Sequence, residues 1–230
     1  MITQIKLSLP VCTFLRDPQE TKLGMQLITE SLDLMDEIGF ESFTFKKLAQ
    51  RIDSTEASIY RYFENKQQLL LFLYTWYWSW MSYRLQQETH NVSTTAEKLN
   101  IAIQLLITSL DDDLQTSIFD EKKLKKIVGH EGIKSLLTKN IDSVNNLGAF
   151  ENYKQLVEKI ASWITELNPD YIYPNMLVTT IIEGSNLQHF FRDHLPRLSN
   201  NTPQEDTVSS FFTHLIESVI FQKNTHGNSH

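Results

Sequence analysis

The sequence of 230 residues contains a single cysteine, Cys12, and only seven glycines. One cysteine excludes an internal disulfide and a cysteine-rich zinc site. Few glycines leave little room for a phosphate-binding loop, and neither a G-x-S-x-G elbow nor a Cys–His arrangement occurs. His189 and His194 are five residues apart and His130-Glu131 is adjacent, and neither spacing places two metal ligands on one helix face. We therefore expect no enzymatic activity, no catalytic residues, no metal and no cofactor.

Long hydrophobic runs are also missing, and the charge balance is negative. No stretch of about 18 apolar residues exists, so we expect no transmembrane helix. Lys6, Pro10 and short apolar segments make the N-terminus a poor signal peptide, which favours a cytoplasmic protein without a membrane partner. The hydrophobic fraction of 41% and the charged fraction of 21% are ordinary for a soluble globular chain. The formal net charge of −7 argues against a protein that coats nucleic acid nonspecifically.

Helical patterning dominates what is present, and it is sharpest between residues 43 and 70. Phe45, Leu48, Ala49 and Ile52 follow the i, i+3, i+4, i+7 spacing of an amphipathic helix. Thr44 stands just ahead of them and is a good N-cap, because its hydroxyl can accept a bond from a free backbone N–H group. The pattern predicts a helix of about two turns.

A second helix is expected at 56–63, after a break at 53–55, with Thr55 as its cap. Asn65 can cap a long third helix that runs to about residue 88, with Gln68 in the third position of a capping box. A helix, a tight turn and a polar, aromatic second helix form the layout that reads a DNA major groove.

The same stretch resembles the DNA-binding region of the tetracycline-repressor (TetR) family of bacterial regulators. The matching residues are Phe43-Thr44, Leu48-Ala49, Ser58-Ile59-Tyr60-Arg61-Tyr62-Phe63, Asn65-Lys66 and Leu69-Leu70. The resemblance covers roughly residues 21–81, with the helix-turn-helix at 44–63. It implies an all-α protein, in which an N-terminal three-helix DNA-binding domain at 21–81 is joined to a larger helical domain at 82–230. That larger domain would bind an effector and form the dimer.

Residues 1–20 precede this region as an arm. Ile5, Leu7 and Leu9 alternate with polar residues, which is closer to an extended segment than to a helix. The arm is either a flexible tail or a segment packed on the DNA-binding domain or on a partner subunit. The helix expected at 21–38 ends at Gly39, and its acidic outer surface should face away from DNA.

The resemblance assigns DNA contacts to particular residues. Ser58, Tyr60, Arg61 and Tyr62 would lie on the recognition helix, and Arg61 is the best base-reading candidate, because a guanidinium can address guanine O6 and N7 together. Phosphates are expected to be held by Thr44, Lys46 and Lys66, of which Lys66 stands at a helix N-terminus. Thr55 would cap its helix and lie near the DNA backbone.

Two positions depart from the family pattern. Asp53 stands in the turn where glycine is common, and Asp tolerates a positive φ better than most residues. Glu56 stands at the entrance of the recognition helix, where it either accepts a bond from cytosine N4 or stabilises the helix N-terminus and weakens phosphate binding. Between residues 44 and 66, five basic against three acidic residues leave a charge of +2, which is a small excess.

Double apolar stripes mark the last two expected helices, at 174–191 and 203–223. The family implies a four-helix dimer interface from these helices, although the stripes alone also fit the core of one subunit. A homodimer is further favoured because one small helix-turn-helix offers too little contact for specific binding. The residues assigned to the interface are Ile181, Ile182, Phe190, Phe211, Phe212, Leu215, Ile216 and Val219.

Aromatic residues in the middle of the chain suggest an apolar effector pocket with hydroxyl and indole donors at its wall. Each of them also fits ordinary core packing. The candidates are Trp76, Trp80, Tyr83, Trp163, Tyr171 and Tyr173. The expected effector is a small molecule of apolar or aromatic character.

The complete reading is a homodimeric transcriptional regulator that binds a double-stranded operator and is released by its effector, with repression as the expected sign. The alternative is a helical ligand-binding or interaction protein that has lost specific DNA binding. Glu56, the acidic first helix and the small local charge motivate this alternative.

Overall fold

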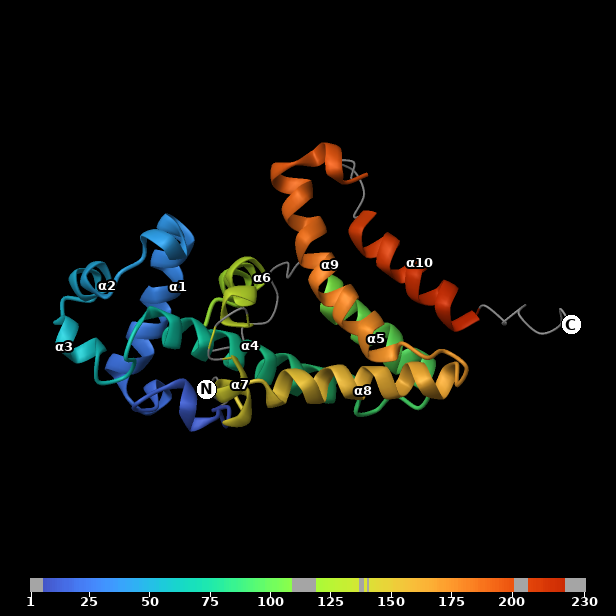
Figure 1. Cartoon of the computed structure of the whole chain (residues 1–230), viewed down its shortest axis with the longest axis horizontal. Helices are drawn as coiled ribbons and strands as arrows, with labels where there is room; N and C mark the ends of the chain where they lie inside the picture. Colours follow the sequence, from blue (N-terminus) through green and yellow to red (C-terminus); the bar gives the residue numbers. More distant parts are fainter. Residues whose placement is uncertain (1–5, 109–118, 137–138, 140, 201–206, 222–230) are drawn as a thin grey trace, which may run out of the picture. The chain divides into compact units, whose positions relative to one another are not determined.

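The computed structural model describes residues 6–108, 119–136, 139, 141–200 and 207–221. Within these ranges the secondary structure is helical and contains no strand, so the all-α expectation is confirmed (Figure 1). The chain forms two compact units, residues 1–80 with 110–153 and residues 81–109 with 154–230. The sequence analysis placed the boundary at residue 81 and so assigned 110–153 to the larger domain, whereas these units group 110–153 with the N-terminal helices.

The first unit begins with the helices around the helix-turn-helix. These are α1 (Lys22–Ser42), α2 (Phe45–Arg51), α3 (Glu56–Ile59) and α4 (Lys66–Thr89), of which α4 runs on past the end of the unit. Gly39 interrupts α1 with φ 75° and ψ 157°, a positive φ that glycine adopts without steric cost, and α1 then continues to Ser42, past the expected end at residue 38. Helix α3 is shorter than expected, because residues 60–62 continue as a turn instead of a helix.

Side-chain caps start these helices at the predicted positions. Thr44 accepts a bond from the Lys47 N–H group at 3.2 Å, and Thr55 accepts one from Ser58 N–H at 3.3 Å. Asn65 Oδ1 accepts from the N–H group of Gln68 at 2.9 Å. Each bond satisfies a backbone donor that a helix leaves free in its first turn, so the short helices are held locally.

The arm at residues 6–20 is folded against the first unit. Residues 6–10 have no regular secondary structure, and two single-turn 3₁₀ helices follow, Val11–Thr13 and Pro18–Glu20. Thr13 and Pro18 are buried. Pro18 approaches α1 so closely that a Cβ on Gly24 would lie 2.3 Å from its carbonyl oxygen. The packed-arm alternative therefore describes residues 6–20.

Helix α6 (Glu121–Leu136) packs on α1 within the first unit and explains the return of 110–153 to it. Three lysines of α6 form ion pairs with acidic residues of α1: Lys123–Asp33 at 2.5 Å, Lys126–Asp36 at 2.6 Å and Lys134–Glu41 at 2.5 Å. The acidic face of α1 is thus covered by a basic helix from about 90 residues further along the chain.

Aromatic side chains surround α4 and are buried on every side, as expected. Trp76, Trp78 and Trp80 are 1%, 3% and 3% exposed, respectively. Tyr74 makes edge contacts with Phe150, which precedes α8 (Glu151–Leu167). The short helix α7 (Ile141–Asn146) lies between α6 and α8 in the chain.

The second unit contains α5 (Thr95–Ile107), most of α8, α9 (Pro174–His194), the 3₁₀ turn Pro196–Leu198 and α10 (Thr207–Phe221). Helix α5 packs against both α9 and α10, which contact each other, and Figure 1 shows α9 crossing α5. His189 Nε2 lies 2.7 Å from the Ile107 carbonyl oxygen, and Gln104 donates to the hydroxyl of Thr213 at 3.1 Å. No helix in the described ranges has the length and apolar character needed to cross a membrane.

Candidate nucleic-acid interface

Helices α2 and α3 present a polar, aromatic surface to solvent. Tyr60 is 49% exposed, and its ring rests edge-on against the buried Phe45 at 5.2 Å. The cap residue Thr55 also bonds the hydroxyl of Ser58 at 3.0 Å, which fixes both side chains at the start of α3. The predicted contact residues that the structure leaves exposed on this surface are Thr44, Lys46, Thr55, Glu56, Tyr60 and Arg61, with Ser58 half-buried.

Tyr62 corrects one expectation, because its side chain does not belong to the outer surface. It is 2% exposed, and its hydroxyl is hydrogen-bonded to that of Thr21 at 2.7 Å. Its carbonyl oxygen accepts a bond from the Leu15 N–H group at 2.7 Å. A tyrosine ring is apolar apart from its hydroxyl, so it can be buried when that hydroxyl has a partner. Tyr62 therefore joins the end of the recognition segment, which is α3 with the turn at 60–62, to the arm and to the start of α1.

The turn between α2 and α3 has the backbone that the sequence predicted. Asp53 adopts φ 49°, and within the described residues it is the one non-glycine residue with positive φ. The N–H group of Ser54 then donates to the Ala49 carbonyl at 2.9 Å, which closes the turn. Asp therefore occupies a conformation in which glycine has no steric cost.

The basic residues of the helix-turn-helix are engaged to very different degrees. Arg51 is bonded to Glu30 at 2.7 Å and to both oxygens of Glu37 at 2.6 and 2.7 Å. The hydrogen bond with Glu37 is the main cause, and the one with Glu30 the second cause, of a pKa of Arg51 that is raised above its ordinary value. Lys47 donates to the Ser42 carbonyl at 2.8 Å. Arg51 is thus neutralised by α1 and is not available to a phosphate.

Lys66 was expected to hold a phosphate, but its ammonium group already has three partners. It donates to the carbonyl oxygens of Phe40, Glu41 and Phe43 at 3.0, 3.1 and 3.3 Å. It also lies 4.7 Å from the centre of the Phe40 ring. An ammonium has three donors, so these contacts use its full capacity. Lys66 fastens the start of α4 to the end of α1, a role that the sequence pattern did not reveal.

The structure separates the predicted pocket residues into two groups. Trp76 and Trp80 belong to the first unit, where their rings stack at 5.9 Å. Tyr83, Trp163, Tyr171 and Tyr173 belong to the second unit. Trp163 is 6% exposed, whereas Tyr173 is 54% exposed and makes an edge contact with Tyr171. An effector pocket lined by all six stays a prediction.

The residues predicted for the dimer interface are also of two kinds. Ile181, Ile182, Phe212 and Ile216 are at most 5% exposed within a single chain, so they belong to its own core. Gly184 permits the close packing of α9 on α10, because a Cβ there would lie 2.9 Å from the Phe212 ring. The remaining members reach the surface, from half-buried positions or, for Phe211, at 56% exposure: Phe190, Phe211, Leu215 and Val219.

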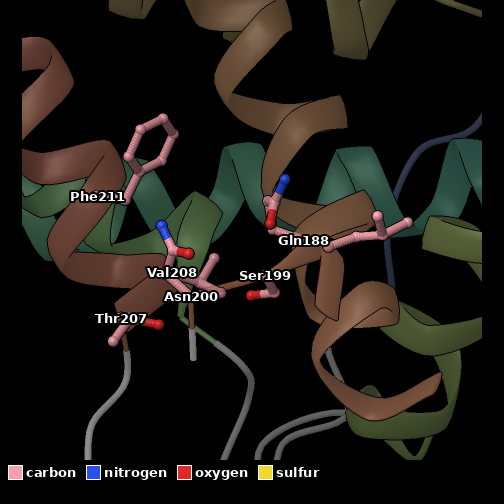
Figure 2. Close-up of a pocket in the computed structure, with 7 residues that line it drawn as sticks. Gln188, Ser199, Asn200, Thr207, Val208 and Phe211 are labelled. Carbon is pink, nitrogen blue, oxygen red and sulfur yellow. The ribbon is translucent and has the colours of Figure 1, made fainter. Parts of the chain in front are cut away.

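Two further exposed apolar residues lie on α9. Met176 and Leu187 are 66% and 50% exposed, and their spacing of three helical turns places them on one face of α9. A hollow of about 170 Å³ lies where α9, the following 3₁₀ turn and α10 meet. Figure 2 shows the amides of Gln188 and Asn200 and the ring of Phe211 around it.

Comparison with known proteins agrees with this geometry. Residues 27–73 match the family of bacterial regulatory proteins described as the tetR family. Over these residues the chain is similar to that family. The matched residues contain α2 and α3 entirely and end within α4.

The chain is also similar to a curated relative, the fatty acid metabolism regulator protein of Bacillus subtilis (strain 168). The two are 24% identical over 102 residues, which are 44% of this chain and 53% of the relative. The match thus spans about half the length of that relative.

Solved structures show the same fold over most of this chain. FadR from Bacillus subtilis, in complex with stearoyl-CoA, has a TM-score of 0.60 and 18% identity over 86% of this chain and 97% of that one. AibR, in complex with isovaleryl coenzyme A and operator DNA, has a TM-score of 0.57 and 12% identity over 85% and 96%. These likenesses establish the fold.

Proposed function

We propose that this protein is a transcriptional regulator that binds operator DNA as a homodimer and is released by an acyl-CoA effector, with repression as its sign. The observation that carries the proposal is the solvent-exposed surface of α2 and α3. Caps on Thr44 and Thr55 fix these helices, and Tyr60 and Arg61 stand free of the core at the end of α3.

The DNA contacts follow from which groups remain available. Among the five basic residues at 44–66, Lys46 and Arg61 have no ion pair or hydrogen bond within the described part of the chain. Arg61 reads a base and Lys46, with Thr44, binds phosphate. Glu56 sits in the first turn of α3, where a carboxylate favours the helix but repels phosphate. Lys66 acts indirectly, by holding α1 against the start of α4.

A dimer supplies the rest of the affinity, because one helix-turn-helix reaches a single half-site. Two copies place their recognition segments in successive major grooves, about 34–36 Å apart. The exposed apolar residues of α9 and α10, including Phe211 and Leu187, are the surface that a second copy covers. Burying them removes apolar area from water, which favours association.

An acyl-CoA effector is supported by the ligands of two proteins with this fold, stearoyl-CoA in FadR and isovaleryl coenzyme A in AibR. The acyl chain of such a ligand is apolar, which agrees with the apolar or aromatic effector expected from the sequence. Effector binding shifts the population of the dimer towards a spacing that no longer matches successive grooves. Helix α4 carries this change, because it begins in the first unit and ends in the second.

The test is selection of genomic DNA fragments by the purified protein at two salt concentrations, followed by titration with acyl-CoA thioesters of different chain lengths. We expect specific enrichment that weakens steeply with salt and release by one range of chain lengths. No enrichment, or affinity indifferent to salt, would leave the alternative of a helical binding protein without specific DNA recognition.

A matched pair of variants tests the assigned roles. Arg61→Ala should relax the preference at one base pair, whereas Lys46→Ala should weaken binding to all operator variants alike. Equal effects of both variants on every operator would contradict these assignments.

A further inference from the structure

The DNA-facing surface has fewer available cations than its sequence contains. The charge of +2 at residues 44–66 includes Arg51, whose guanidinium is held by Glu30 and Glu37 outside that range. Without Arg51 the excess falls by one, and Glu56 is exposed at the leading end of α3. Because phosphate neutralisation supplies much of the affinity of a DNA-binding protein, another cation is expected beside this surface.

The arm places a cation beside the trailing end of the recognition segment. The Arg16 side chain is exposed, and its guanidinium carbon lies 5.6 Å from the centre of the Tyr62 ring. The neighbouring Leu15 N–H group donates to the Tyr62 carbonyl at 2.7 Å, so the arm backbone is fixed to the same residue. Arg16 is therefore held next to the residue that follows Arg61.

The attachment of the arm continues on both sides of this point. Gln68 of α4 donates to the Cys12 carbonyl at 3.4 Å, and Phe14 packs edge-on against Phe72 at 6.2 Å. On the other side, the Thr21 hydroxyl meets that of Tyr62. A side chain held this way loses less conformational freedom on binding than one on a loose tail.

Arg16 is also the cation of the described arm that has no ion-pair partner. Lys6 is bonded to Glu20 at 2.9 Å and lies 3.6 Å from Asp17. The pKa of Glu20 is lowered chiefly by its hydrogen bond with Lys6, next by the charge of Lys6 and least by the charge of Arg16. Lys6 is thus a natural control for Arg16, because both are cations of the arm and one of them is paired.

We propose that Arg16 binds a phosphate of the operator at the trailing end of the recognition segment, as a DNA contact supplied by the arm. The major groove is about 12 Å wide, so a segment inside it has phosphate backbones on both sides. Thr44 and Lys46 contact the backbone next to α2, and Arg16 contacts the backbone at the opposite end, beside Arg61, which reads a base. A guanidinium matches phosphate oxygens with two parallel donors.

The inference rests on the proposed DNA binding and is tested on the full-length protein with its selected operator. Affinity is measured across a series of salt concentrations for the wild type, Arg16→Met, Arg16→Lys and Lys6→Met. Arg16→Met should lower the salt slope by about 1 for each half-site, about 2 for a dimer, by the same amount on every operator variant. Arg16→Lys keeps the charge and should keep the slope, and Lys6→Met should match the wild type.

The outcomes separate the two proposals. Wild-type protein that selects no operator would overturn the proposed function and this inference with it. Wild-type binding with an unchanged slope in Arg16→Met would overturn the inference alone. Equal loss of affinity in Arg16→Met and Arg16→Lys, at an unchanged slope, would also overturn it, because Arg16 would then only support the Tyr62 ring. Melting curves of each variant confirm that the protein is folded.

Discussion

Replacing Tyr62 with phenylalanine tests whether the end of the recognition segment is fastened to the start of α1. The ring is 2% exposed and stays in place, while the Tyr62 hydroxyl and its 2.7 Å hydrogen bond with Thr21 are removed. Thr21 still accepts from the Gly24 N–H group at 2.9 Å and is only half-buried, so no group is left both buried and unbonded. The expected loss in the free energy of unfolding is about 1 kcal/mol, the net value of one such bond.

The assay is urea unfolding at one fixed protein concentration, because dimerisation would make the midpoint depend on concentration. Tyr60→Phe is the matched control, since Tyr60 is 49% exposed and should change stability by less than about 0.5 kcal/mol. A cycle of Tyr62→Phe with Thr21→Val isolates the pair and should show coupling of roughly 0.5–1.5 kcal/mol.

Operator preference provides the second measurement. Because the Tyr62 hydroxyl faces Thr21 and not solvent, Tyr62→Phe should keep the base preferences of the wild type. A variant with wild-type stability and altered base preference would refute this reasoning, since it would place the hydroxyl on DNA.

Three further changes follow from local geometry. Asp53→Gly should raise the free energy of unfolding by about 0.5 kcal/mol in urea melts, because it relieves the positive φ of 49°, whereas Asp53→Val should lower it. The side chains of Lys123 and Asp33 are 35% and 27% exposed. A mutant cycle of Lys123→Met and Asp33→Asn should therefore show a coupling energy of about 0.5 kcal/mol that disappears in about 0.5 M salt. A coupling energy that does not change with salt would contradict an ion pair. The hydrogen bond with Arg51 lowers the pKa of Glu37 below its ordinary value of 4.5, so this pair stabilises the fold above that pH and is lost as the pH falls through the lowered pKa. Arg51→Met should therefore lower the melting temperature more at pH 7 than at pH 3, and the reverse order would contradict the pairing.

Local signals in the sequence predicted much of the first unit. The caps Thr44, Thr55 and Asn65 and the break at Gly39 depend on interactions over a few residues, which a sequence displays directly. The positive φ of Asp53 was predictable for the same reason. Roles that depend on distant partners were harder to predict. Lys66 resembled a phosphate-binding residue until the carbonyl groups at the end of α1, some 25 residues away, were seen around it.

The sequence by itself thus determined that the protein is helical and that residues 44–63 form a helix-turn-helix, since both depend on periodicity and short-range capping. Only the tertiary structure decided which polar groups of that motif face outward. Tyr62 lies inside because its hydroxyl is hydrogen-bonded to that of Thr21, and Arg51 is ion-paired with two glutamates of α1. The basic helix α6 covers the acidic face of α1 for the same reason. Charges and hydroxyls select partners by distance in space, and that distance is set by the packing of helices far apart in the chain.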